Sequence, residues 1–142
     1  MTIYLDTSVV LRTLLGDGEP LPAWGAWDHA YSSELMGVEA RRALDRLRLE
    51  QALDDAGLAD AHDALAATER AIGEIRLTAA VLRRAGQSMP TVVKTLDAIH
   101  LASALLFAER RDADLVFGTH DSRQATAARA LGFRVLGTAS ST

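Results

Sequence analysis

The chain begins with a short apolar run, Ile3-Tyr4-Leu5, that ends at an acidic residue, Asp6. Such a run fits a strand that is buried on both faces, as strands of parallel sheets are. In open α/β sheets, ligands bind beyond the carboxyl ends of the strands. Asp6 therefore stands where such a sheet binds its ligands, and the pattern predicts an α/β domain with an acidic site.

Short apolar runs continue to alternate with longer helical patterns along the chain. Beyond the first strand, we expect strands over residues 29–32, 75–77, 115–117 and 133–136. Helical spacing of apolar residues predicts helices over residues 8–15, 34–53, 59–73, 78–86, 96–109 and 122–131. This alternation predicts a three-layer α/β/α sandwich around a short, mostly parallel sheet.

Polar and glycine residues mark several of the expected helix ends. Ser33 and Thr95 are expected N-caps, whereas Gly57 and Gly132 are expected to end helices or the turns after them. The helix over residues 96–109 is apolar on nearly every side, so we expect it to be buried.

Length and composition limit the classes of protein to which the chain could belong. With 142 residues, of which 49% are hydrophobic, we expect one domain over residues 1–142. The lack of cysteine excludes disulfides, zinc–thiolate sites and thiol catalysis. Asp6 interrupts the first apolar run, and residues 96–108 are too few to span a bilayer, so we expect no signal peptide and no membrane segment. The expected location is the cytoplasm.

Three further acids occupy positions comparable to that of Asp6. Glu39 shares the apolar side of its helix with Leu35 and Ala43, although it could instead pair with a nearby arginine, Arg42 or Arg46. Asp97 lies in the first turn of the most apolar helix, and Asp121 follows a strand and opens a helix. The four acids are Asp6, Glu39, Asp97 and Asp121.

Carboxylates gathered in one place repel each other unless a cation binds between them. Burial of an unpaired charge costs several kcal/mol, and Mg²⁺ and Mn²⁺ favour oxygen ligands. The four acids are therefore candidate metal ligands and catalytic residues. The alternative is structural: Asp6 and Asp121 could cap the helices that follow them, and Asp97 could stabilise its helix dipole.

Charge and the remaining polar residues add weaker evidence. The net charge of −4 argues against a protein that coats nucleic acid, but the four acids account for all of it, so a nuclease stays possible. His100 is expected to be a hydrogen-bonded core residue, and His120 could approach the site. Ser8 could orient Asp6 through a hydrogen bond or cap the first helix. Gly-rich phosphate loops and Gly-x-Ser-x-Gly elbows are absent from the sequence.

Four blocks of sequence resemble the PIN-domain ribonucleases, and within them the VapC-type toxins of toxin–antitoxin pairs. The blocks are Leu5-Asp6-Thr7-Ser8, Gly37-Val38-Glu39-Ala40, Leu96 to Ala104, and Leu115 to Asp121 followed by Ala128, Leu131, Gly132 and Phe133. The block around Asp97 is the most specific, and residues 52–93 match only in helical character.

The resemblance implies an Mg²⁺- or Mn²⁺-dependent endoribonuclease that uses a metal-activated water. It implies that Asp6, Glu39, Asp97 and Asp121 form the acidic metal site, with Thr119 as the hydroxyl residue before the last acid. The implied partners are an RNA substrate, a cognate antitoxin and a second copy of the chain.

One departure from the family pattern concerns the end of the last block. Ser122 and Arg123 stand where some relatives carry an additional acid, which weakens the case for a second metal ion. Arg123 could instead contact an RNA phosphate or an antitoxin carboxylate.

Two other functions remain open on the residues alone. A phosphoryl-transfer enzyme or receiver domain would also place Asp6 after the first strand. However, Ser8 stands where an aspartyl phosphatase would carry a second Asp, and no lysine follows Lys94. In a non-catalytic interaction module, the acids would serve only as caps and salt-bridge partners.

Overall fold

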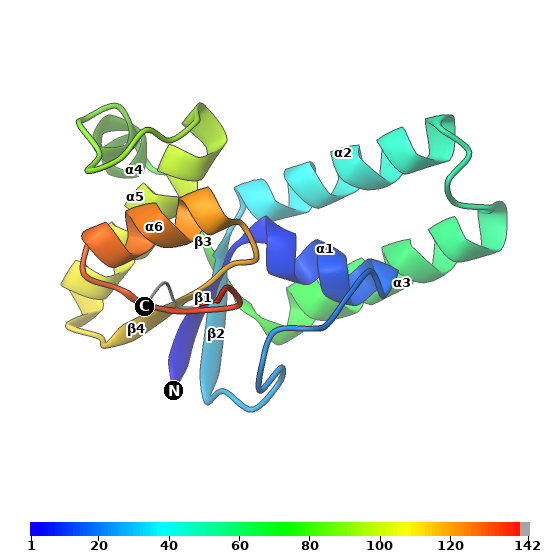
Figure 1. Cartoon of the computed structure of the whole chain (residues 1–142), viewed down its shortest axis with the longest axis horizontal. Coiled ribbons are helices and arrows are strands. Elements are labelled where there is room, and N and C mark those ends of the chain that lie inside the picture. The colour runs from blue at the N-terminus through cyan, green and yellow to red at the C-terminus, as the bar shows by residue number, and fades with distance from the viewer. Residues whose placement is uncertain (140–142) are drawn as a thin grey trace.

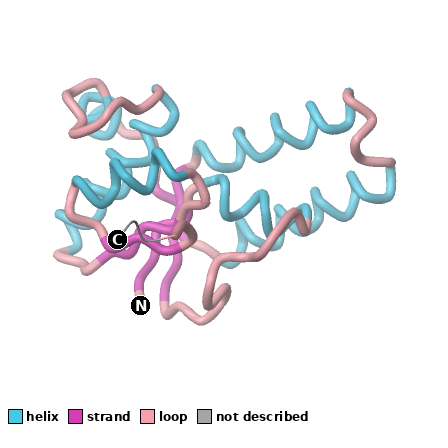
Figure 2. Tube along the Cα trace, in the orientation of Figure 1, coloured by secondary structure: helices cyan, strands magenta, loops and turns pink. Residues whose placement is uncertain are grey.

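The structure, a computed structural model, describes residues 1–139. Its sheet has the order β3-β2-β1-β4-β5, and every neighbouring pair is parallel. Helices cover both faces of the sheet (Figure 2). The predicted α/β/α sandwich is therefore confirmed, and the sheet is parallel throughout.

Strands and helices alternate over most of the described chain. The strands are β1 (Thr2–Leu5), β2 (His29–Ser33), β3 (Gly73–Ile75), β4 (Leu115–Gly118) and β5 (Arg134–Leu136). The helices are α1 (Thr7–Leu15), α2 (Leu35–Leu49), α3 (Asp55–Ala71), α4 (Ala79–Ala85), α5 (Thr95–Arg111) and α6 (Ser122–Ala130).

The central strands send alternate side chains into two separate cores. On one face, Ile3 and Leu5 of β1 and Val116 of β4 pack with α1, α2 and α3. On the other face, Tyr4 and Phe117 pack with α5 and α6. Since both faces are buried, β1 and β4 contain uninterrupted apolar runs, as strands of parallel sheets do.

Two long helices extend beyond the sheet. In Figure 1, α2 and α3 run side by side away from the strands and are joined by a turn at their far end. Arg41 of α2 and Glu69 of α3 form an ion pair, with Nη2 2.6 Å from Oε1. The helices α4, α5 and α6 gather at the other side of the molecule.

Several predicted helix ends are wrong by a few residues. The helix that begins after Ser33 ends at Leu49 rather than at residue 53, and Gln51 has a positive φ of 59°. Gly57 does not end a helix: it lies in the first turn of α3, where its N–H donates to Asp54 Oδ1 at 2.7 Å. Asp54 therefore starts α3 before the predicted residue 59, because it caps the free amides of the first turn.

The predicted caps are correct in part. Thr95 is the first residue of α5 rather than its N-cap, and Lys94 in the cap position makes no side-chain cap bond. Ser33 lies one residue before the cap position of α2, but its Oγ accepts the Leu35 N–H at 3.0 Å. Gly132 follows the C-cap of α6 with φ 97°, a conformation that favours glycine.

Candidate metal and catalytic site

The acids approach each other where the strand order reverses. From β1 the chain proceeds to β2 and β3 on one side of the sheet and later to β4 and β5 on the other. The carboxyl ends of β1 and β4 are therefore neighbours, and the Asp6 N–H donates to Gly118 O at 2.9 Å. Such a reversal leaves a crevice beyond the strand ends, where open α/β sheets bind ligands.

Asp6 is fixed at this crevice by two hydroxyl groups. Its Oδ2 accepts from Ser8 Oγ and from Thr119 Oγ1, each at 2.8 Å, and only 5% of the residue is exposed. The predicted orienting role of Ser8 is confirmed. The alternative, that Asp6 caps α1, is correct only in position: Asp6 is the N-cap residue of α1, but its side chain makes no cap bond.

Glu39 reaches the crevice from α2 and contacts a histidine. Its Oε1 lies 2.5 Å from His100 Nε2 and accepts from Thr7 Oγ1 at 2.7 Å. The alternative pairing of Glu39 with Arg42 or Arg46 is therefore wrong. Burial raises the pKa of Glu39, but the hydrogen bonds from His100 and Thr7 and the charge of His100 outweigh it and hold that pKa below its usual value.

His100 links Tyr4 of β1 to Glu39 of α2, as expected of a hydrogen-bonded core residue. It is fully buried, and its Nδ1 lies 2.6 Å from Tyr4 Oη. Burial lowers the pKa of His100, yet the hydrogen bond with Glu39 and the charges of Asp6, Glu39 and Asp97 raise it above its usual value. Burial likewise raises the pKa of Tyr4, which stays a neutral phenol. Both pKa shifts are in the direction that favours the charged forms of His100 and Glu39.

Asp97 comes from the first turn of α5 and is half-buried. Burial raises its pKa, and the negative charges of Asp6 and Asp121 raise it further. Within residues 1–139, no hydrogen bond ends on its carboxylate, but its carbonyl oxygen accepts from Gln124 Nε2 at 3.0 Å. Asp97 therefore offers an unpaired carboxylate close to other negative charges.

Asp121 takes the cap position of α6, as its structural alternative predicts. Its Oδ1 accepts the N–H groups of Arg123 at 2.8 Å and Gln124 at 3.2 Å. Its own N–H donates to Thr119 Oγ1 at 3.0 Å. A capping carboxylate has a second oxygen, so the cap does not prevent Asp121 from contacting a ligand.

One pocket of about 480 Å³ is lined by all four acids. They come from four separate stretches of sequence, with Asp6 and Asp121 on loops after strands and Glu39 and Asp97 on helices. Thr7 and Ser8 also line this pocket, together with Arg42 and Arg46 of α2. The structure thus places side by side the residues that sequence reasoning selected, and we refer to this cavity as the carboxylate pocket.

The chemistry of these donors fits a hard divalent cation. They are oxygen ligands of one charge, and their mutual repulsion already raises the pKa of Asp97. In the described part of the chain, no three acidic or histidine side chains are already oriented as a complete metal-binding group. Hydrogen bonds occupy one oxygen each of Asp6, Glu39 and Asp121, which leaves their other oxygens for an ion.

Some residues that build the site were not selected from the sequence. Thr7, Tyr4 and Gln124 are uncharged, and their contacts join segments about 27 to 96 residues apart. His120 N–H donates to Ser8 Oγ at 3.1 Å, and its Nδ1 lies 2.9 Å from Gly137 O, so this histidine is packed between the site and the segment after β5. Sequence spacing carries no signal for such contacts.

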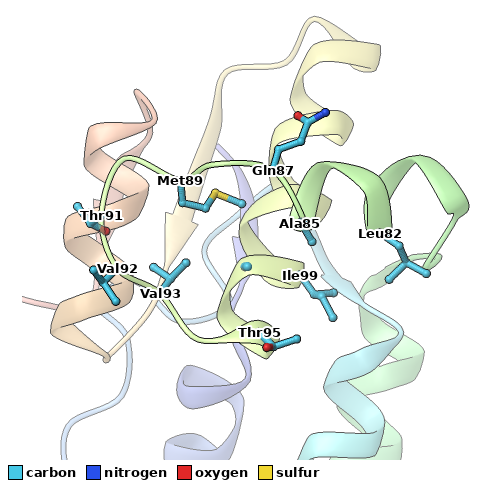
Figure 3. Close-up of a pocket in the computed structure, with 11 residues that line it drawn as sticks. Leu82, Ala85, Gln87, Met89, Thr91, Val92, Val93, Thr95 and Ile99 are labelled. Atoms are coloured by element: carbon cyan, nitrogen blue, oxygen red, sulfur yellow. The ribbon is translucent and has the colours of Figure 1, made fainter.

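Another pocket, also of about 480 Å³, contains no acidic or histidine side chain that could hold a metal. It lies between α4, the segment before α5 and α5 itself (Figure 3). Its lining is apolar or uncharged: Leu82, Ala85, Gly86, Gln87, Met89, Thr91, Val92, Val93, Thr95, Ala98 and Ile99. The carboxylate pocket is therefore the better candidate for a metal site.

Comparisons with known proteins agree with this geometry. A family model described as "PIN domain" matches residues 3–130. Among solved structures, a chain of the VapBC2 crystal structure from Rickettsia felis, bound to a DNA fragment from their promoter, is similar at a TM-score of 0.64. The two chains are 9% identical over 95% of this chain and 97% of the other, so this likeness concerns the fold. No curated protein matches the sequence. Over residues 1–139, no helix is long and apolar enough to cross a membrane.

Proposed function

The chain belongs to the PIN domain family, and from this premise we propose that it is an Mg²⁺- or Mn²⁺-dependent endoribonuclease. The observation that supports this most is the convergence of Asp6, Glu39, Asp97 and Asp121 on one pocket. A set of oxygen ligands with this charge suits a divalent ion and an anionic substrate such as a phosphodiester. The proposed reaction is the hydrolysis of RNA phosphodiester bonds by water.

In this proposal Asp6, Glu39, Asp97 and Asp121 would hold the metal. When bound, the ion would supply the Lewis acidity that activates water and neutralises phosphate charge. The chain's own residues orient the ligands: Ser8 and Thr119 hold Asp6, while Thr7 and His100 hold Glu39. Partners of this kind fix ligand orientation and raise metal affinity.

We further propose that the protein is the toxin of a toxin–antitoxin pair and acts in the cytoplasm. The similar Rickettsia felis chain was crystallised as part of VapBC2, and the sequence blocks resemble VapC-type toxins. The expected partners are RNA, an antitoxin and a second copy of the chain. Co-expression with a small reading frame found next to its gene would test the antitoxin, and light scattering of the purified protein tests the dimer.

The two alternative functions have less support. A receiver domain has the strand order 2-1-3-4-5, whereas this sheet has the order 3-2-1-4-5. A non-catalytic module explains the cap formed by Asp121 but not the position of Asp97, whose carboxylate accepts no hydrogen bond within residues 1–139 and lines one pocket with three other acids. Calorimetric titration with Mn²⁺ at neutral pH separates it from the nuclease, since the module would bind no ion.

Cleavage mapping on total cellular RNA, with Mn²⁺ and with EDTA, tests the proposed function. Wild type should cut RNA only with the metal, and Asp97→Asn should not cut. Asp114→Asn is the matched control: Asp114 precedes β4 at the opposite edge of the sheet and its side chain is 88% exposed. Cuts that persist in EDTA or in the Asp97 variant would contradict the proposal.

A further inference from the structure

We propose that the carboxylate pocket is the middle of a groove that holds the RNA backbone on both sides of the cleaved bond. Arg42 and Arg46 bind phosphates on one side, and Lys94 and Arg123 bind phosphates on the other. This inference rests on the proposed function and adds to it the path of the substrate. It assigns a role to four cations outside the metal site.

The first pair of cations lies on α2, on the same helix as Glu39. Arg42 and Arg46 are one turn apart and both line the carboxylate pocket. Arg42 Nη1 lies 3.2 Å from Asp45 Oδ2 with a side chain that is 71% exposed, so solvent weakens this pairing. Among the described residues, Arg46 forms no ion pair. Both guanidinium groups are therefore available to an anion that enters the pocket.

The second pair lies on the other side of Asp97 and Asp121. Lys94 precedes α5 and Arg123 lies in the first turn of α6, and both line a hollow of about 290 Å³. Neither side chain is in an ion pair within residues 1–139, and both residues are exposed. The Arg123 N–H binds Asp121, which fixes the backbone at Arg123 while its side chain stays free to contact a ligand.

The two hollows are neighbours that share two lining residues. Asp97 and Asp121 line both the carboxylate pocket and the hollow of Lys94 and Arg123, so the acids lie between the two pairs of cations. Val92 and Val93 also line the hollow of Lys94 and Arg123; both residues belong to the segment before α5, where Figure 3 labels them. A chain of evenly spaced phosphates matches this order of charge: cations, a metal-binding centre, and cations.

Electrostatics explains why the acids need such neighbours. The protein has a net charge of −4, and four carboxylates in one pocket repel a phosphate backbone. A bound divalent ion offsets that repulsion only at the centre. Cations on each side attract the neighbouring phosphates, and arginine suits phosphate because its planar fork donates two parallel hydrogen bonds. Contacts with phosphates position a strand without selecting its sequence.

The dependence of RNA binding on salt tests this inference. The full chain carrying Asp97→Asn, which prevents cleavage, is titrated with a fluorescein-labelled single-stranded RNA in Mg²⁺ at several NaCl concentrations. Each phosphate contact on a single strand contributes about −0.7 to the slope of log K against log[salt]. Replacing both cations of one pair (Arg42→Gln with Arg46→Gln, or Lys94→Gln with Arg123→Gln) should reduce that slope by about 1.4.

Arg83→Gln with Arg110→Gln is the control of equal charge, because both residues are exposed and neither lines either hollow. The control should keep the slope of the parent. The inference would be overturned if both groove variants had the same salt slope as the control. It would also be overturned if only one pair of cations changed the slope. RNA cleavage by the wild-type protein is scored separately, so a cutting enzyme with unchanged slopes would leave the proposed function standing and reject this groove.

Discussion

Gln124 Nε2 donates a hydrogen bond to the carbonyl oxygen of Asp97 at 3.0 Å, across 27 residues of sequence. Gln124 is fully buried, and its N–H binds Asp121 Oδ1 at 3.2 Å. One side chain thus ties the first turn of α5 to the first turn of α6. The distance between the Asp97 and Asp121 backbones depends on this contact.

Gln124→Met should therefore weaken metal binding. The variant keeps a side chain of similar length but loses the hydrogen bond to the Asp97 carbonyl, which contributes about 0.5–1.5 kcal/mol of stability. Loss of a partner that orients metal ligands costs roughly 10–100-fold in affinity. Calorimetry with Mn²⁺ measures this change, and Thr126→Ala on the exposed side of α6 is the control. Equal Mn²⁺ affinities in the two variants would show that Gln124 does not position Asp97.

Asp6→Asn and Asp97→Asn should each abolish RNA cleavage while the fold survives. Loss of a ligand-orienting partner already costs roughly 10–100-fold, so loss of a ligand should cost at least about 100-fold. Asp97→Asn also removes a carboxylate that neighbouring negative charge disfavours, so the metal-free variant should unfold at the same temperature as wild type or higher. Circular dichroism and an RNA cleavage assay measure both effects. Full activity in either variant would remove that residue from the site.

Mn²⁺ should stabilise the wild-type protein against heat. A ligand that binds only the folded state at 100 times its Kd adds about 2.7 kcal/mol. For a domain of this size, that corresponds to an increase of roughly 5–11 °C in Tm. Differential scanning calorimetry with Mn²⁺ and then with EDTA measures it. Asp6→Asn should show little or no shift, and an equal shift in this variant would place the ion elsewhere.

The pair formed by His100 and Glu39 should contribute to stability as well as to the site. His100→Ala leaves Glu39 and Tyr4 without their shared partner, and breaking a buried ion pair costs about 3–5 kcal/mol. Because the Glu39 side chain is 21% exposed, we expect the lower end of that range. Urea unfolding measures the loss. His62→Ala, on the exposed side of α3, is the control and should change the free energy of unfolding by less than about 0.5 kcal/mol. Similar losses of stability in the two variants would show that the contact between His100 and Glu39 does not stabilise the fold.

The order of strands and helices could be predicted from the sequence because it depends on local patterns. Ile3, Leu5 and Val116 belong to short apolar runs, and the acids follow strands or open helices at recognisable positions. The fold followed from these patterns, whereas the family followed from the resemblance of four sequence blocks to the PIN-domain ribonucleases. The exact helix ends did not: Asp54 starts α3 through a cap that competes with the glycine signal at Gly57.

Apart from the hydrogen bond of Ser8 to Asp6, the contacts within the site could not be predicted, since they join distant residues. A sequence shows that His100 lies on an apolar helix, but not that its ring bridges Tyr4 and Glu39. The structural alternative placed the partner of Glu39 on its own helix, because arginines one turn away are the visible candidates there. The folded backbone instead presents Glu39 to α5, and burial makes the hydrogen bond with His100 stronger than an exposed pairing with arginine.

The central claim is that the four carboxylates bind one divalent metal centre. The most direct measurement is anomalous diffraction at the manganese edge from crystals grown with Mn²⁺. We predict an anomalous difference peak in the carboxylate pocket, about 2.0–2.2 Å from oxygens of Asp6 and Asp97. A fully loaded crystal with no manganese in this pocket, or with manganese bound only to other residues, would contradict it.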